Sequence, residues 1–97
     1  MQTQLGPGYE HLLEIRQWAV IGRAEDADMQ ILDNCVSRRH AKILVGRSDG
    51  QVVLTLTDLD SANGTFVNQE QVLSSHRLRV GDVIEMGGVR LCLQRID

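Results

Sequence analysis

The chain has 97 residues and a formal net charge of −3, and hydrophobic residues make up 42% of it. This length suits one domain, and the apolar fraction is too high for a disordered segment. No apolar run approaches the roughly 20 residues of a membrane-spanning helix, and the mild acidity disfavours broad electrostatic binding to nucleic acid. We therefore expect a single soluble domain, over residues 1–97, that binds neither membranes nor nucleic acid.

Few residues of this sequence indicate a cellular compartment or a metal site. No basic segment precedes an apolar stretch at the N-terminus, so no signal peptide is visible. Cys35 and Cys92 lie far apart and predict reduced thiols in a cytoplasmic protein, with a single disulfide as the alternative. The three histidines have no metal-ligand spacing with the cysteines. We expect no metal site and no cofactor.

Short strand patterns occur along the whole chain, and no window of ten or more residues has a capped helical periodicity. The predicted strands are, in chain order, 9–15, 18–21, a brief strand near 29–32, 41–45, 52–59, 65–67, 72–73, 83–86 and 89–94. Turns are predicted at Gly22-Arg23, Asp49-Gly50, 60–64, 68–71, Gly81-Asp82 and Gly87-Gly88. Such closely spaced strands, without a linker or internal repeat, indicate an all-β sandwich or barrel.

Three polar segments interrupt these strands: Gly22-Arg23, Ser37–His40 and Ser61–Thr65. Because loops cluster at the ends of a β-sandwich, we expect these segments to meet at one end. Arg23 and Arg38 offer guanidinium groups suited to phosphate or carboxylate, and Ser37 offers a hydroxyl donor. The amide of Asn63 can donate and accept, which suits a peptide backbone. Together they predict a small anion site beside a backbone clamp, within a stretch, 23–42, that holds four of the ten basic residues.

Two catalytic or metal-binding interpretations of the same segments are weak. Ser37 and His40 are residue types that can act as a nucleophile and its base. The pairing is weak, because no orienting carboxylate accompanies them. Asp58 and Asp60 suggest the start of a calcium-binding EF-hand loop, but Asn63 stands where that loop requires glycine. We therefore expect a domain that is not an enzyme and binds no metal.

An ordered set of four motifs resembles the forkhead-associated (FHA) domain family. The motifs are Ile21-Gly22-Arg23, Val36–Ala41, Asp58–Asn68 and Leu78–Ile84, and the resemblance runs from about residue 12 to residue 96. Any one motif is a weak signal, whereas all four in this order and spacing are specific. The resemblance implies a sandwich of two twisted, mainly antiparallel sheets with about eleven strands and recognition loops at one end.

The resemblance also implies a function and roles for named residues. FHA domains bind phosphothreonine-containing peptides without catalysis. Arg23 would contact the phosphate directly, and Ser37 would hydrogen-bond a phosphate oxygen. Arg38 would add a further contact to the phosphate or the peptide, and Asn63 would hold the peptide main chain. The structural supports of the site would be Gly22, His40 and Gly64. Cys35 and residues 24–28 would read the peptide beyond the phosphothreonine.

Ala62 departs from the family pattern, in which many members carry Thr or Ser at this place. Ala62 keeps only its backbone N–H, so the missing hydroxyl lowers the expected affinity by roughly 1.5 to 3 kcal/mol. Two functions therefore follow. The first is a phosphothreonine-dependent binding module for Ser/Thr-kinase signalling, with residues 9–96 as its core, residues 1–8 as a lead, and a larger parent protein. The alternative is a phosphate-independent scaffold or self-association domain.

Overall fold

The computed structural model describes residues 2–6, 11–14 and 17–96. Within these residues eleven strands form two sheets, and no helix is present. The strands are β1 (Gln2–Gly6), β2 (His11–Glu14), β3 (Trp18–Gly22), β4 (Met29–Gln30), β5 (Ala41–Ser48), β6 (Gln51–Asp58), β7 (Thr65–Val67), β8 (Glu70–Gln71), β9 (Ser75–Leu78), β10 (Val83–Met86) and β11 (Val89–Ile96). No helix found in the described part of the chain is long and apolar enough to cross a membrane.

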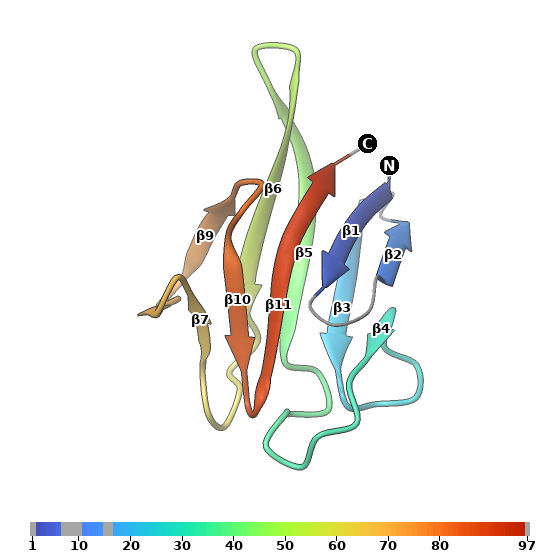
Figure 1. Ribbon diagram of the computed structural model, residues 1–97, viewed down its shortest axis with the longest axis vertical. Helices are drawn as coiled ribbons and strands as arrows, with labels where there is room; N and C mark the ends of the chain where they lie inside the picture. The colour runs from blue at the N-terminus through green and yellow to red at the C-terminus, as the bar shows by residue number, and fades with distance from the viewer. Residues whose placement is uncertain (1, 7–10, 15–16, 97) are drawn as a thin grey trace.

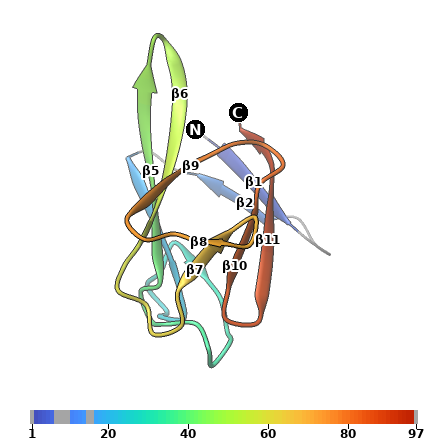
Figure 2. The same cartoon turned by 90° about the vertical axis from the view of Figure 1, so that its left-hand side faces the viewer.

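The strands pack as a two-layer sandwich (Figures 1 and 2). One sheet has the order β2-β1-β11-β10-β7-β8 and the other the order β4-β3-β5-β6-β9. The short pair β3 and β4 is parallel, whereas the other pairs are antiparallel. The expected all-β sandwich of two mainly antiparallel sheets is confirmed.

Alternation along the central strands explains why the two sheets face each other. In β5, Ala41 and Ile43 are fully buried, whereas Lys42 and Leu44, which alternate with them, point away from the partner sheet. Burial of one face of each sheet is what stabilises a sandwich, at about 25 cal/mol for each Å² of apolar surface removed from water. The core consists of Ala19, Ile21, Met29, Ile31, Val36, Ala41, Ile43, Leu54, Leu56, Val67, Val72, Leu78, Ile84, Met86, Leu91 and Leu93.

The hairpin between β5 and β6 has the turn that the sequence predicts. Asp49 and Gly50 both have positive φ, 52° and 78°, and Ser48 pairs with Gln51. A two-residue turn of this kind matches the right-handed twist of the paired strands. The hairpin extends beyond the rest of the sandwich, at the end away from the β3–β4 loop (Figure 1).

The predicted return strand at 72–73 is wrong. The turn after β7 contains only Asn68 and Gln69, which have φ values of 50° and 71°, so β8 already begins at Glu70. Asn68 supports this early turn, because its side-chain oxygen accepts the Val83 N–H at 3.0 Å and its amide donates to Asp82. The turn is thus fixed by contacts with a distant segment rather than by its own sequence.

Two strands lie where no strand was predicted. β1, inside the expected 1–8 lead, pairs with β11 and β2, and β9 forms an edge of its sheet beside β6. The segment Ser75–Leu78 has no apolar alternation that would predict a strand, and only its Leu78 is buried. The predicted strand 9–15 corresponds to β2, and its residues 9–10 and 15 lie outside the described residues.

The strand directions bring several loops to one end of the sandwich. β3 and β6 end there, β5 begins there, and the β10–β11 hairpin turns there at Gly87-Gly88 (Figure 1). The three polar segments that interrupt the strands therefore lie at this end, which we call the loop end.

Candidate functional site

The loop end is held together by backbone hydrogen bonds between the end of β3 and the segment before β5. The Arg23 N–H donates to the Ser37 carbonyl and the Ala24 N–H to the Arg38 carbonyl, both at 3.0 Å. The His40 N–H donates to the Ile21 carbonyl at 2.9 Å. Residues 37–40 thus run directly beside Gly22 and Arg23. These two polar segments meet, as expected from the sequence.

Gly22 permits this close approach because it has no side chain. A Cβ at Gly22 would lie 2.1 Å from the Arg38 carbonyl oxygen and 3.0 Å from the His40 nitrogen. The first distance is too short for a real contact and the second is tight, so the backbone would have to move. Glycine at this position therefore determines how near Arg23 comes to Ser37.

His40 joins two of the loops from inside the protein. Its side chain is fully buried, its Nδ1 accepts the Ser37 backbone N–H at 2.9 Å, and its Nε2 lies 2.8 Å from the Gly64 carbonyl. A nitrogen that accepts an N–H carries no proton, so the imidazole is neutral and Nε2 donates to Gly64. Gly64, with a φ of 85°, presents that carbonyl toward the histidine.

The arrangement excludes the Ser37–His40 nucleophile–base pair. Both imidazole nitrogens are already used, and the contact with Ser37 is made by its backbone rather than by its hydroxyl. The Ser37 oxygen instead accepts the Ala62 N–H at 3.0 Å. This bond leaves the hydroxyl hydrogen of Ser37 available as a donor.

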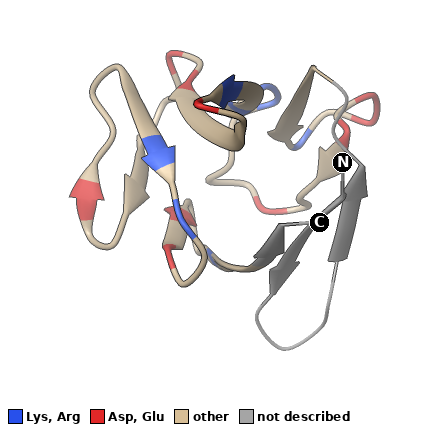
Figure 3. Ribbon diagram, turned by 90° about the horizontal axis from the view of Figure 1, so that it is seen from above, with Lys and Arg blue, Asp and Glu red and all other residues tan. Residues whose placement is uncertain are grey.

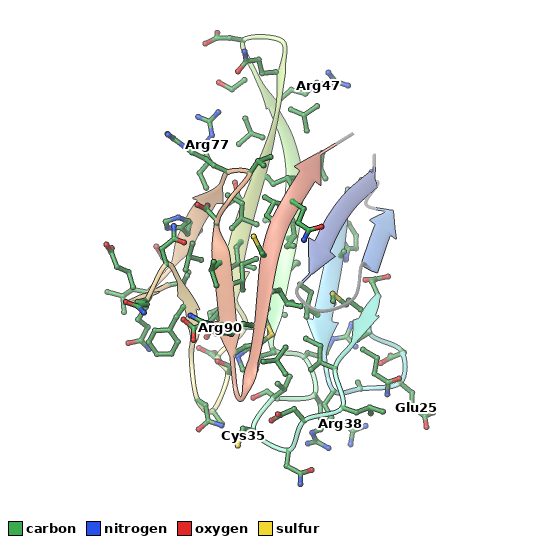
Figure 4. All side chains as sticks on the ribbon, viewed as in Figure 1. Glu25, Cys35, Arg38, Arg47, Arg77 and Arg90 are labelled. Atoms are coloured by element: carbon green, nitrogen blue, oxygen red, sulfur yellow. The ribbon has the colours of Figure 1, made fainter. Side chains whose placement is uncertain are left out.

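Arg23 and Arg38 line the same open groove beside Ser37. The groove has a volume of about 690 Å³ and is lined by Arg23, Ala24, Glu25, Asp26, Gln30, Leu32, Asn34 and Arg38. The Arg23 side chain is exposed, and its Nε donates to the Val36 carbonyl at 3.1 Å, which fixes the direction of the guanidinium. Arg38 lies at the loop end, the same end of the molecule as Cys35 and Glu25, in Figure 4.

Asn63 lies over the other side of the same loops. Its exposed amide donates to the Cys35 carbonyl at 2.8 Å, and both residues line a second groove of about 600 Å³. Phe66, Gln69, Glu85 and the Gly87-Gly88 turn complete the lining of this second groove. The amide is thereby oriented while its oxygen stays available as an acceptor.

The loop that carries Asn63 is ordered by the carboxylate of Asp58. Its oxygens accept the Ser61 hydroxyl at 2.6 Å, the Thr65 hydroxyl at 2.7 Å and the Ser61 N–H at 3.1 Å. Burial raises the pKa of Asp58, but these hydrogen bonds outweigh burial and hold its pKa below the ordinary value. The Ser61 oxygen in turn accepts the Gly64 N–H at 2.9 Å.

The structure therefore brings the predicted site residues together at the loop end. Arg23, Ser37, Arg38, Ala62 and Asn63 surround the exposed side of the loops, and Gly22, His40 and Gly64 lie beneath or between them. Lys42 does not join this group, since it points outward from the five-stranded sheet.

Sequence reasoning missed the acidic residues that shape the loops. The sequence places Asp58 in an incomplete EF-hand pattern and in the third family motif, but neither pattern predicts that it orders the loop. Its position three residues before Ser61 is typical of a carboxylate that closes a turn. Asp33 accepts the Cys35 N–H at 2.8 Å in the same manner.

Both cysteines are free, so the alternative of a disulfide is wrong. Among the residues that the structure describes, no cluster of three potential metal ligands occurs.

Comparison with known proteins identifies this arrangement of loops and sheets. Residues 19–87 match the FHA domain family. FhaA of Mycobacterium tuberculosis, an FHA domain-containing protein, is 45% identical over 87% of this chain and 15% of its own length. An FHA domain studied for phosphothreonine-dependent interactions is 37% identical over the whole chain and 99% of that structure, with a TM-score of 0.81. The FhaA FHA domain in complex with the intracellular domain of Rv3910 is 39% identical, with a TM-score of 0.78, over 96% of this chain and 98% of that one.

The class of molecule is thus a β-sandwich binding domain whose functional loops gather at one end. The chain belongs to the FHA domain family, as the motif resemblance predicted. Its family and its named relatives are binding or regulatory proteins, so the expectation that it is not an enzyme is confirmed. The chain spans less than half the length of the first curated relatives that it matches.

Proposed function

We propose that this domain binds phosphothreonine-containing peptides at the loop end. The observation that carries the proposal is the bond between the Ser37 oxygen and the Ala62 N–H at 3.0 Å. It holds the Ser37 oxygen at the exposed side of the loops with its hydroxyl hydrogen free to donate, and the Arg23 guanidinium is fixed at the same loops. A phosphothreonine carries about −1.5 to −2 charge and three acceptor oxygens, which match these donors.

Each predicted residue then has a role in binding. Arg23 and Ser37 donate to the phosphate, Arg38 adds positive charge in the same groove, and Asn63 pairs with the peptide main chain. Gly22, His40 and Gly64 keep the loops at the right separation. The peptide residues on either side of the phosphothreonine lie in the two grooves, toward residues 24–26 and toward Cys35.

The cellular setting of this binding follows from the same class of function. We propose a partner protein phosphorylated by a Ser/Thr kinase, with the domain, 1–97, as one module of a larger cytoplasmic protein. The two free cysteines support a reducing compartment, and the named relatives support a longer parent chain. Nucleic acid, a membrane and a cofactor have no part in this proposal.

Calorimetry with peptides tests the proposal. A peptide selected from a phosphothreonine library is titrated in its phosphorylated and unphosphorylated forms into the wild-type domain. We expect binding only of the phosphorylated form, and loss of that binding in both Arg23→Ala and Ser37→Ala. Arg47→Ala is the matched control, because Arg47 lies on the β5–β6 hairpin far from the loop end (Figure 4). Absence of any phosphate-dependent binding across the library contradicts the proposal.

A phosphate-independent scaffold is the second candidate, and Ala62 is the observation that favours it. Its N–H already donates to Ser37, and it has no hydroxyl to offer a phosphate. If a partner protein binds equally well with and without phosphorylation, the scaffold replaces the phosphothreonine module. Self-association is the third outcome and is measured as concentration-dependent mass by analytical ultracentrifugation.

A further inference from the structure

The outer face of the five-stranded sheet carries a row of side chains that the phosphothreonine site does not use. Trp18 lies opposite Leu44, Leu44 opposite Thr55, and Thr55 opposite Arg77, so the row crosses β3, β5, β6 and β9. Side chains of directly opposed residues project to the same side of a sheet. The outer-face patch is defined here as Trp18, Lys42, Leu44, Val53 and Arg77.

Two large apolar side chains of this patch are exposed to water. Trp18 is 54% exposed and Leu44 is 36% exposed, whereas their chain neighbours Ala19 and Ile43, on the other side of the sheet, are buried. Tryptophan is a residue type that is enriched at the energetic centres of protein interfaces. A half-exposed tryptophan beside an exposed leucine therefore indicates a contact surface rather than a core position.

The patch is positively charged in a chain whose net charge is −3. Neither Lys42 nor Arg77 forms an ion pair with any carboxylate that the structure describes, whereas Arg39 pairs with Asp26 and Arg90 with Glu85. Within the five strands of this sheet the one carboxylate is Asp58, which lies opposite the buried Ala41 and thus faces the core side. Lys42 and Arg77 thus give this face two cationic groups, and the carboxylate of Asp28, in the β3–β4 loop, lies at β3, where it accepts the Val20 N–H at 2.7 Å.

This charge argues against a second copy of the chain as the occupant. A symmetric contact between two patches places Lys42 and Arg77 of both copies in one interface, and neither patch contains a carboxylate. Like charges in such a contact disfavour association, whereas opposite charges favour it. The complementary occupant carries carboxylates and apolar side chains together.

We propose that the outer-face patch docks an acidic protein segment with large apolar side chains. Trp18 and Leu44 cover its apolar groups, and Lys42 and Arg77 pair with its carboxylates. Trp18 is four residues before Gly22 in β3, about 13 Å along the strand, so both surfaces can be occupied together. Arg77 and Arg38 lie toward different ends of the molecule in Figure 4.

Trp18 is the single tryptophan of the chain, so its fluorescence reports directly on the patch. The probe is a short unphosphorylated peptide rich in Glu, Leu and Phe, and its control has Lys in place of every Glu. We expect the acidic peptide alone to shift the Trp18 emission to shorter wavelength, with binding that weakens as salt is added. Arg77→Glu is expected to weaken that binding at least about tenfold, and Arg47→Glu is expected to leave it unchanged.

A second readout keeps the test independent of fluorescence and of folding. In Trp18→Ala, calorimetry is expected to show at least a tenfold loss of affinity for the acidic peptide, while Trp18→Phe retains most of it. Amide NMR spectra show whether each variant is folded. Equal binding of the acidic and basic peptides, absence of binding, or binding instead to vesicles that contain phosphatidylserine overturns the proposal. A phosphothreonine peptide that leaves the Trp18 emission unchanged separates this surface from the loop end.

Discussion

At the scale of single residues, Gly22 has the most demanding position at the loop end. Its backbone runs so close to residues 37–40 that a Cβ would lie 2.1 Å from the Arg38 carbonyl oxygen. We expect Gly22→Ala to lower the free energy of unfolding by about 1 to 3 kcal/mol, because the packed loop has to shift. Urea unfolding measures this change.

Gly46 provides the matched control for this prediction. It lies in β5 without positive φ, and a Cβ there would meet nothing within 4 Å. Gly46→Ala is therefore expected to be neutral or slightly stabilising, because alanine restricts the unfolded chain. Equal losses of stability in the two variants would show that the close approach at Gly22 has no special energetic role.

Ala62 leads to a prediction in the opposite direction, a gain of binding. Ala62→Thr adds a hydroxyl next to Ser37 while it leaves the backbone N–H in place. If the loop end binds phosphothreonine, the added donor is expected to tighten peptide binding by about 1.5 to 3 kcal/mol. Calorimetry with the wild type and the variant measures the difference, and unchanged or weaker binding contradicts the assignment of Ala62 to the site.

The chemical types of the site residues could be predicted from the sequence, but their hydrogen bonds could not. Arg23, Ser37 and Asn63 stand out because they are polar residues between strands, and the structure places them together. That His40 accepts the Ser37 backbone N–H, and that Asn63 donates to a carbonyl 28 residues away, depends on how three loops fit together. No local pattern in the sequence contains that information.

At the scale of elements, the loop between β6 and β7 depends on one carboxylate. The native pKa of Asp58 is lowered, so the stability it contributes is present above the ordinary carboxyl pKa of 3.8 and is lost as the pH falls below it toward the lowered native value. We expect the melting temperature to fall across this acidic range. We also expect Asp58→Asn to lower the free energy of unfolding by about 2 kcal/mol at neutral pH, because a hydrogen bond to the charged carboxylate is lost.

The comparison variant for this pH dependence is Asp49→Asn, at the exposed tip of the β5–β6 hairpin. Asn tolerates the positive φ of this position, so the hairpin is expected to keep its turn. Melting curves of the wild type and the two variants between neutral and acidic pH show whether Asp58 causes the loss of stability in acid. If the acid loss of stability is as large in Asp58→Asn as in the wild type, Asp58 is not its source.

The elements themselves were predictable where local chemistry determines them. Asp49-Gly50 predicts its hairpin because both turn positions need positive φ, and β5 and β6 alternate between core and solvent. β9 and the turn at Asn68 and Gln69 were not predictable. The first is an edge strand with a single buried side chain, and the second is stabilised by Asp82 and Val83 from another part of the chain.

At the scale of the whole molecule, the charges of the described residues are interspersed around the sandwich rather than gathered on one side (Figure 3). Recognition therefore depends on a few groups held at fixed places, namely the loop end and the outer-face patch. These two surfaces have different chemistry. The loop end offers donors for a phosphate, whereas the patch combines an exposed indole with two cationic side chains.

The most direct test of the central claim is an NMR titration of the domain with a phosphothreonine peptide and with its unphosphorylated form. The phosphorylated peptide is expected to shift the amide signals of Arg23, Ser37, Ala62 and Asn63, while those of Trp18 and Leu44 stay in place. The unphosphorylated peptide is expected to shift none of them. Shifts that are the same for both peptides, or that leave the loop end unaffected, would contradict the assignment of this end of the sandwich to phosphothreonine recognition.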